Sequence, residues 1–357
     1  MVPKMLIDLG KLRYNAQTMV TNCAQRGIGV AAVTKVFCAD EKVVGAFAQT
    51  GVEWLADSRV QNIQSYPAGH GKKTMLLRAP LPQQAAQVVA VCDASLNSEQ
   101  VTLAALAEAA AAQNKRHGVV LMVDLGDLRE GLYYTKPEAV LETAGFVLGQ
   151  KSLALLGLGV NLTCYGAIIP TREKMETLCG LAAQIESRFS VKLPVVSGGN
   201  SSSVQLLLDG QMPKGITNLR LGESLARAEE TAYQQSIPGL EPDAVVLEAG
   251  LVEVQEKPSY PDGDIGLNAF GEKTHYEDRG PMLRGIVALG RQDTDHEGLA
   301  CQDRDVEILG ASSDHLIVNL SASKNSYKVG DTLRFSMNYS AILKGFTSKY
   351  VDREYIP

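Results

Sequence analysis

The stretch GVAAVTKVFCAD, residues 29–40, begins as an apolar, β-branched run and ends at a single basic side chain, Lys35. Its first half has the composition of a strand buried on both faces, as found in parallel sheets. A strongly hydrated ammonium is costly to bury without a partner. Two interpretations are therefore open: a strand-end lysine whose head group reaches water, or a lysine used in chemistry.

Further segments of the same kind follow along the chain, and helical patterns lie between them. Together with 28–35, the predicted strands are residues 53–57, 74–78, 88–92, 118–124, 154–161, 193–197 and 217–221. Helices are predicted over 99–113, with Asn97 or Ser98 as the cap, and over 172–188, capped by Thr171. Eight β-α units in about 230 residues predict a (β/α)8 barrel of the TIM type. A doubly wound sheet is the alternative.

The composition changes after Ala232. The segment QQSIPGLEP, residues 234–242, is typical of a linker. Segments such as DHLIVNLS (314–321) and DTLRFSM (331–337) then alternate apolar and polar residues between turn signals. We therefore predict an α/β protein of two domains, with the barrel over 1–235 and a smaller, mostly β domain over 236–357.

The overall composition limits the kind of partner. The 357 residues include 21% charged and 45% hydrophobic residues, with a net charge of -6, which argues against nucleic acid or an anionic membrane. Six scattered cysteines without a C-x-x-C pair are typical of thiols in a reducing compartment. No signal-peptide core and no apolar run of roughly 20 residues is present in the sequence. We expect a cytoplasmic protein with a small-molecule substrate and no metal site.

Polar loops follow the predicted strands at the barrel end where catalytic groups collect. They are DLGDLREG (124–131), NLTCYG (161–166), SGGNSSS (197–203) and RLGES (220–224). SGGNSSS suits a phosphate, because its glycines let the backbone approach and its hydroxyls and a helix N-terminus donate hydrogen bonds. Alone this signal is weak, because stretches rich in glycine and serine are usually plain turns. A single lysine facing a phosphate-binding rim predicts pyridoxal phosphate, held by Lys35 as a Schiff base.

These segments resemble the alanine racemase family of fold-type III pyridoxal-phosphate enzymes. The resemblance runs almost end to end and is carried by TKVFCAD, MVDLGDLREG, GVNLTCYGAIIP, VSGGNSSS, GITNLRLGES, ILGASSDHLIVNL and YSAILKGFTSKY. It implies a barrel followed by a β domain and an amino-acid racemase. Within the family it points to a diamino acid such as ornithine, or also lysine, as the substrate. A homodimer with sites completed across the interface is implied as well.

The resemblance also implies roles for individual residues. Lys35 would bind the cofactor and act as one catalytic base, Arg220 would contact the pyridine nitrogen, and Arg129 would lie near the phenolic oxygen. A guanidinium keeps its proton, so Arg220 makes the ring a weaker electron sink, which suits racemisation better than decarboxylation or transamination. The other cofactor contacts implied are Thr163, Asn200, Ser201, Gly222, Glu223 and Tyr339.

Three residues depart from the family pattern, and the third of them affects the second catalytic group. Met122 stands where many alanine racemases have a carbamylated lysine, Thr163 replaces a histidine beside the cofactor, and Arg291 stands where the partner subunit's tyrosine base is expected. The candidates for the opposite face are Cys164, Tyr165, Asp293, Asp314 and His315. We predict Cys164 and Asp314 as catalytic residues. Asp293 and Asp314 are also candidates for binding the distal ammonium of the substrate, although both suit ordinary turns.

Two other functions share the cofactor loops. A non-catalytic pyridoxal-phosphate carrier would resemble the barrel alone, so the second domain argues against it. A fold-type III decarboxylase of basic amino acids would share both domains. Arg220 argues against this decarboxylase, because an acidic ring partner is expected there.

Overall fold

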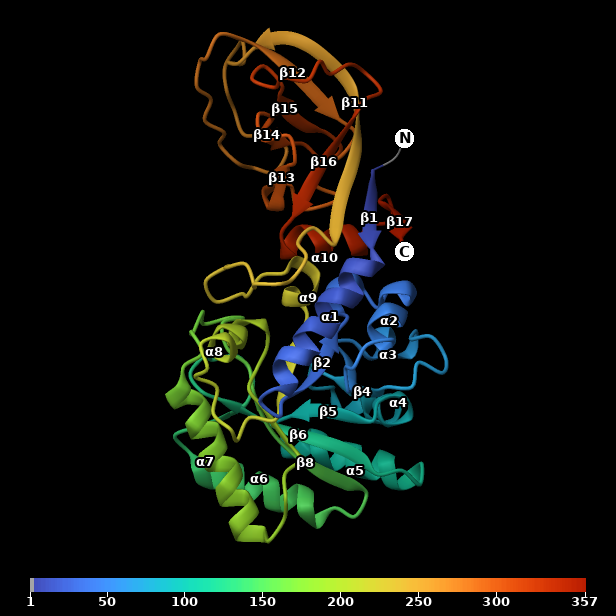
Figure 1. Ribbon diagram of the computed structural model, residues 1–357, viewed down its shortest axis with the longest axis vertical. Helices are drawn as coiled ribbons and strands as arrows, with labels where there is room; N and C mark the ends of the chain where they lie inside the picture. Colours follow the sequence, from blue (N-terminus) through green and yellow to red (C-terminus); the bar gives the residue numbers. More distant parts are fainter. Residues whose placement is uncertain (1–2) are drawn as a thin grey trace. The chain divides into compact units, whose positions relative to one another are not determined.

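The computed structural model describes residues 3–357, which divide into two compact units (Figure 1). One unit is Leu9–Pro242; the other combines β1 (Lys4–Asp8) with Asp243–Pro357. These boundaries differ from the predicted 1–235 and 236–357 at both ends. The reason is that β1 pairs in parallel with β17 (Asp352–Ile356) and antiparallel with β11 (Val245–Pro258). A five-residue strand carries no local signal of partners so far away in sequence.

The first unit is the predicted barrel, closed by eight parallel strands that pair in chain order. They are β2 (Gly29–Val33), β3 (Trp54–Asp57), β4 (Lys73–Leu76), β5 (Ala94–Asn97), β6 (His117–Asp124), β8 (Leu153–Val160), β9 (Val195–Ser197) and β10 (Asn218–Leu221). β10 pairs with β2 and so closes the ring, with Arg220 opposite Ala31. The two-residue β7 (Leu132–Tyr133) adds to β6. This closure rules out the doubly wound sheet.

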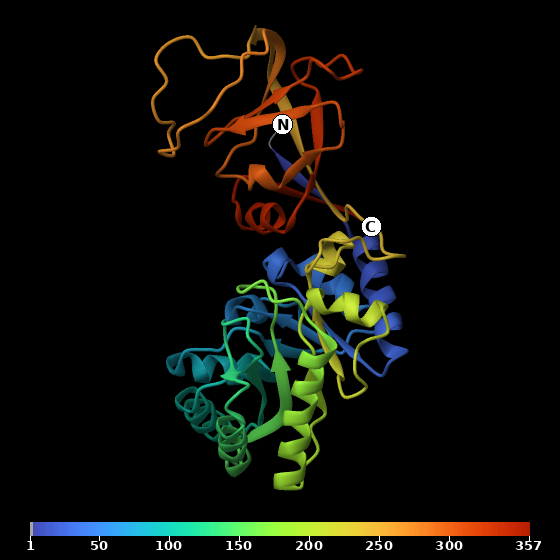
Figure 2. The ribbon, with the colours of Figure 1, turned by 90° about the vertical axis from the view of Figure 1, so that its left-hand side faces the viewer.

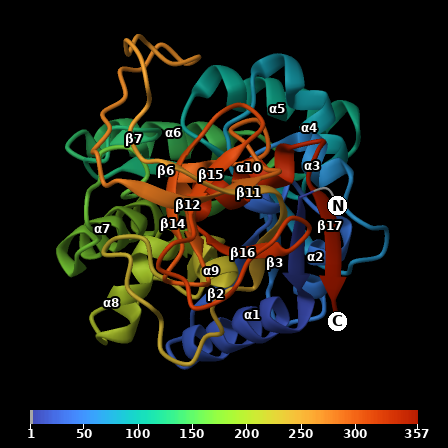
Figure 3. The ribbon, with the colours of Figure 1, turned by 90° about the horizontal axis from the view of Figure 1, so that it is seen from above.

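Helices surround the barrel strands, as the view from above shows (Figure 3). They are α1 (Leu9–Ala24), α2 (Glu41–Ala48), α3 (Val60–Gln64), α4 (Ala85–Val91), α5 (Gln100–Ala112), α6 (Pro137–Gly149), α7 (Arg172–Phe189), α8 (Val204–Leu208) and α9 (Glu223–Arg227). α7 begins as predicted, since the Thr171 hydroxyl accepts a hydrogen bond from Lys174 N at 3.3 Å. The cap of α5 is Glu99, in place of the predicted Asn97 or Ser98.

One predicted strand is wrong. Residues 88–92 belong to α4 and its C-cap, and the strand at this place in the barrel is β5, over residues 94–97. A short apolar run has the same pattern in a buried strand and in a helix, so periodicity cannot separate the two. The helical turn that leads into α4 starts at Pro82, a residue favoured in the first turn of a helix.

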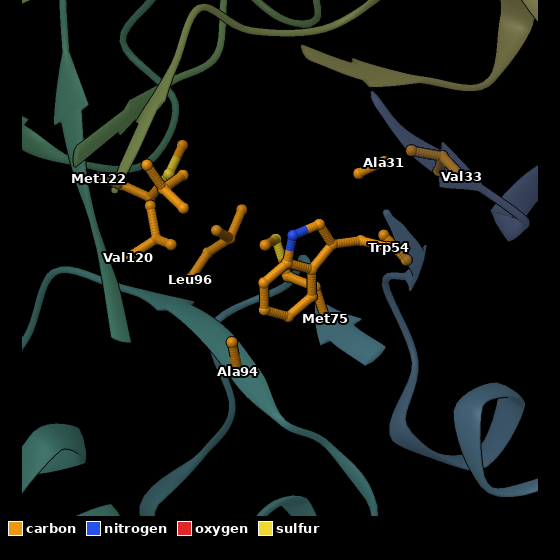
Figure 4. Close-up of a cluster of buried hydrophobic side chains, with 10 residues drawn as sticks. Ala31, Val33, Trp54, Met75, Ala94, Leu96, Val120 and Met122 are labelled. Atoms are coloured by element: carbon orange, nitrogen blue, oxygen red, sulfur yellow. The ribbon is translucent and has the colours of Figure 1, made fainter. Parts of the chain in front are cut away.

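The barrel interior is a packed apolar cluster beneath the strand ends (Figure 4). The indole of Trp54 reaches into the centre of the cluster. Met122, which stands where many alanine racemases have a carbamylated lysine, is also part of the cluster. Burying one large apolar side chain contributes about 1.5–3 kcal/mol, so this cluster gives the loops above it a rigid base. Its members are Ala31, Val33, Trp54, Ala56, Met75, Ala94, Leu96, Val120, Met122 and Val195.

The second unit is mostly antiparallel β structure, as predicted. β11 pairs with β1, with β12 (Pro281–Val287) and with β16 (Thr332–Met337), and a long loop between β11 and β12 extends from the sheet in orange (Figure 2). The other elements are β13 (Leu299–Cys301), β14 (Glu307–Ala311), β15 (Leu316–Asn319) and α10 (Tyr339–Thr347). Over residues 3–357, every helix is too short or too polar to cross a membrane.

Candidate functional site

Lys35 stands at the carboxyl end of β2, where the strand gives way to a helical turn over Lys35–Phe37. It is half-buried, directly after a fully buried Thr34. The turn is completed by Cys38 and Ala39, both in the left-handed region with φ of 48° and 55°. Asp40 then caps α2 by accepting hydrogen bonds from two of its main-chain N–H groups, at 3.1 and 3.2 Å. The barrel therefore presents Lys35 at the end where this fold places catalytic groups.

Arg220 lies inside the barrel end on β10 and is only 3% exposed. Its Nη1 donates to Ser197 Oγ at 2.5 Å, and its Nη2 donates to the main-chain oxygen of Val160 at 2.7 Å. Ser197 in turn donates to Asn218 Oδ1 at 2.7 Å. Burial lowers the pKa of Arg220 to about 10, which leaves it charged at neutral pH. A buried cation with two neutral oxygen partners is thus fixed between three adjacent strands.

The loops after β9 and β10 are joined by two serines. Ser201 Oγ lies 3.0 Å from Ser224 Oγ and accepts a hydrogen bond from Ser224 N at 3.1 Å. Asn200 accepts from Ser202 N at 2.8 Å and so caps the helical turn Ser201–Ser203 that leads into α8. SGGNSSS, which was predicted to suit a phosphate, and RLGES therefore form one continuous surface of hydroxyls and helix N-termini.

Two further observations fit an anion at this surface. Ser202 Oγ is buried, and it finds no hydrogen-bond partner among residues 3–357, which is rare for a buried polar group. A Cβ at Gly222 would lie 3.1 Å from Val33 Cβ, so a side chain at this point would crowd β2. Phosphate oxygens would satisfy the Ser202 hydroxyl and would approach the backbone at Gly222.

Polar side chains from three neighbouring loops meet beside Arg220. Asn200 Nδ2 donates to Asn161 Oδ1 and to the Leu162 main-chain oxygen, both at 3.0 Å, and lies 3.3 Å from Cys164 Sγ. Both terminal nitrogens of Arg129 lie 3.2 Å from one terminal atom of the Asn161 amide. Sequence reasoning missed Asn161, although its position at the end of β8 was the available signal.

Thr163 and its neighbours form a loop whose main chain is hydrogen-bonded to a buried carboxylate. Asp127 is fully buried and accepts hydrogen bonds from the N–H groups of Tyr165, at 3.1 Å, and Ile168, at 3.3 Å. Thr163 has a φ of 72° and donates its hydroxyl proton to the Ile168 oxygen at 2.9 Å. Within this unit Cys164 and Tyr165 are exposed. The loop therefore offers the thiol and the phenol, whereas the Thr163 hydroxyl is used within the loop.

Glu223 begins α9 and is paired with Arg227, at 2.8 Å, which also contacts Glu229 at 2.7 Å. Burial raises the pKa of Glu223, while Arg227 and, more weakly, the charge of Lys35 act in the opposite direction. Glu223 therefore lies close enough to Lys35 for the two charges to interact, and β2 and β10, which carry or precede them, are paired. The barrel residues predicted from the sequence all lie at or after the carboxyl ends of barrel strands.

The remaining predicted residues belong to the second unit. Asp314 is exposed and accepts a hydrogen bond from Gln292, and Asp293 is buried and accepts from Gly290 N at 2.7 Å. Burial raises the pKa of Asp293, and the nearby charge of Asp314 adds to this effect. Arg291 binds both carboxylate oxygens of a glutamate in the β11–β12 loop, at 3.0 and 2.9 Å. His315 is exposed, and Tyr339 is the first residue of α10.

Comparison with known proteins gives consistent matches. Residues 7–228 match the family model described as alanine racemase, N-terminal domain. The chain is 48% identical over 354 residues to an ornithine racemase of Acetoanaerobium sticklandii, and 36% identical over 356 residues to a lysine racemase of Thermotoga maritima. Each alignment covers 99% of both chains.

Solved structures agree with the fold. An alanine racemase from Streptomyces lavendulae superposes with a TM-score of 0.77 at 17% identity, over 100% of this chain and 97% of that chain. An alanine racemase from Bartonella henselae with covalently bound pyridoxal phosphate gives a TM-score of 0.74 at 15% identity, over 100% of both chains. At these identities the match shows a shared architecture.

Proposed function

Because this chain belongs to the alanine racemase family, we propose that it is a pyridoxal-phosphate-dependent racemase that interconverts L- and D-ornithine. The observation that carries the proposal is the environment of Arg220: a buried guanidinium held by a serine hydroxyl and a main-chain oxygen. No carboxylate takes part in this arrangement within the described chain. Lysine is the second candidate substrate, supported by the similarity to a lysine racemase.

The barrel site fits the cofactor. Lys35 would bind it covalently, Arg220 would contact the ring nitrogen, and the joined serine loops would hold the phosphate. When bound, pyridoxal phosphate supplies an electron sink for the charge left at the α carbon. The residues proposed to contact it are Lys35, Arg129, Thr163, Asn200, Ser201, Ser202, Arg220, Gly222, Glu223 and, from the second unit, Tyr339.

The chain's own groups would move one proton on each face of the α carbon. Lys35 would remove or return this proton on one face, and its place at the strand end, above a packed core, would fix its approach. Cys164 is the barrel's candidate for the other face, since Asn200 Nδ2 lies 3.3 Å from its sulfur. Asp314 is the candidate from the second unit. Arg220 would hold its proton and so limit side reactions that need a stronger electron sink.

A diamino acid needs acceptors for its distal ammonium, because losing hydration without replacement is costly. Asp293 and Asp314 are our candidates, and the exposed Asp314 is the more accessible of the two. We further propose, from family membership, a homodimer that completes the site and a cytoplasmic location.

The proposal is tested by incubating L-ornithine with the protein and pyridoxal phosphate. Loss of optical rotation at constant mass, with D-ornithine found by chiral chromatography, is the expected result. Release of carbon dioxide would identify a decarboxylase, and an unchanged substrate would identify a carrier. Borohydride reduction followed by peptide mapping should label Lys35, and a label on another residue would overturn the assignment.

A further inference from the structure

A buried polar network lies directly behind Lys35. The Thr34 hydroxyl is 2.8 Å from Asp57 Oδ2, at the end of β3, and 2.7 Å from the hydroxyl of Tyr66, which follows α3. Thr34 and Asp57 are fully buried, and Tyr66 is nearly so. The Thr34 main chain also donates to the Ala56 oxygen at 2.9 Å, which aligns the ends of the two strands. Neither the cofactor contacts nor the proton transfers proposed above use this network.

The network has a defined proton order. Asp57 Oδ1 accepts from Arg59 N and from Asn62 Nδ2, each at 3.0 Å. Burial raises the pKa of Asp57, and these bonds together with that of Thr34 act in the opposite direction. In the ionised form both of its oxygens are acceptors. Thr34 has one hydroxyl proton and donates it to Asp57, which leaves its oxygen to accept from Tyr66. Burial raises the pKa of Tyr66, so the phenol keeps the proton that it donates.

A network that buries a carboxylate costs free energy of folding, which a purely structural role would not explain. None of the ion pairs within residues 3–357 includes Asp57, and a buried carboxylate without a cation is less favourable than apolar residues of the same volume. Buried networks of this kind are typically retained where one geometry has to be specified. Here the geometry is that of the residue before Lys35.

The backbone after Lys35 needs such support. Cys38 and Ala39 are consecutive left-handed residues, and each costs roughly 1–2 kcal/mol relative to a right-handed conformation. A turn with this strain persists only when its surroundings fix both ends. Asp40 fixes the end that enters α2, and the Thr34 network fixes the end that leaves β2.

We propose that Thr34, Asp57 and Tyr66 are positioning residues that hold the turn bearing Lys35 so that its amine meets the cofactor and the α carbon. This inference rests on the proposed function of Lys35. Thr34 acts through Lys35 rather than by touching substrate. Loss of the Thr34 hydroxyl should therefore slow the steps that involve Lys35 and should have little effect on the stability of the fold.

The test uses the cofactor-loaded enzyme and the variants Thr34→Val, Thr34→Ser and Tyr66→Phe. Stopped-flow absorbance measures how fast added L-ornithine displaces Lys35 from the cofactor, and a melting curve measures stability. The matched control is Thr74→Val, which breaks a similar Thr–Asp contact of 3.0 Å, to Asp93, at the opposite end of the barrel.

We expect Thr34→Val and Tyr66→Phe to slow displacement at least about tenfold relative to Thr74→Val, since small misplacements of a reacting group have large effects on rate. Thr34→Ser, which keeps the hydroxyl, should stay within about twofold of the parent. If both variants react as fast as Thr74→Val, or if Thr34→Ser is as slow as Thr34→Val, the positioning role is refuted. A borohydride label away from Lys35 would instead refute the proposed function itself.

Discussion

Replacing Ser202 by alanine should have opposite effects on the cofactor-free and cofactor-loaded protein. In the absence of a ligand, the buried Ser202 hydroxyl has no partner among residues 3–357, and such a group costs about 1–3 kcal/mol. Removing one oxygen also loses some packing, so we expect a net gain of about 1 kcal/mol in the free energy of unfolding. In the loaded protein, the same change removes a hydrogen bond to a charged phosphate, worth about 1.5–3 kcal/mol. The dissociation constant of the cofactor should therefore rise about 10- to 100-fold.

Ser203→Ala is the matched control, one residue along the same turn. Ser203 Oγ donates to the Gly198 oxygen at 2.6 Å, so its loss should destabilise both forms by about 1 kcal/mol and change affinity little. Urea unfolding followed by the fluorescence of Trp54, the single tryptophan, reports the stability of the barrel core. Calorimetric titration with pyridoxal phosphate reports affinity. A less stable cofactor-free Ser202→Ala protein, or an affinity equal to that of Ser203→Ala, would refute the role of this hydroxyl.

Three further predictions concern stability and specificity. Burial lowers the pKa of His117 to about 4 from an ordinary 6.5, so on acidification the unfolded chain binds a proton before the folded chain does. The free energy of unfolding should therefore fall by roughly 3 kcal/mol between pH 6.5 and 4. In urea titrations His117→Gln should reduce this dependence of stability on pH. Gly157→Ala places a Cβ 1.7 Å from the Val195 oxygen at a φ of 153° and should cost more than about 3 kcal/mol by chemical denaturation, whereas Gly149→Ala, in α6, should be neutral or stabilising. Asp314→Asn should reduce the preference for ornithine over alanine in kcat/KM by at least about tenfold, and an unchanged ratio would exclude Asp314 from substrate binding.

The parts of the barrel that could be predicted are those whose structure is determined by neighbouring residues in the sequence. The apolar run before Lys35 became β2, and the serine and glycine loops after β9 and β10 became the joined surface, because strand ends and turn residues carry short-range signals. The strand predicted at residues 88–92 was wrong because a run of only five apolar residues is too short for its periodicity to separate a helix from a strand. Arg220 was predicted as a site residue from the sequence, but its two neutral hydrogen-bond partners depend on how β8, β9 and β10 lie side by side.

Other features depend on contacts that sequence patterns do not encode. Asp57 has the composition signal of a turn residue, and only the alignment of β2 with β3 places it against Thr34. Asp127 likewise supports a loop nearly 40 residues away along the chain. The pairing of β1 depends on strands that are distant in sequence, so the predicted domain boundary could not include it.

The pairing of β1 has a consequence for biosynthesis. Lys4 is synthesised long before its partners, because Glu248 and Asp352 lie far along the chain. At translation rates of about 5–20 residues per second, β1 waits about 10–50 s before β11 is synthesised and about 20–70 s before β17 is synthesised, while the barrel between them can already close. A fragment that begins at Asp243 would lack the strand that separates β11 from β17, and would leave two unprotected edges prone to aggregation.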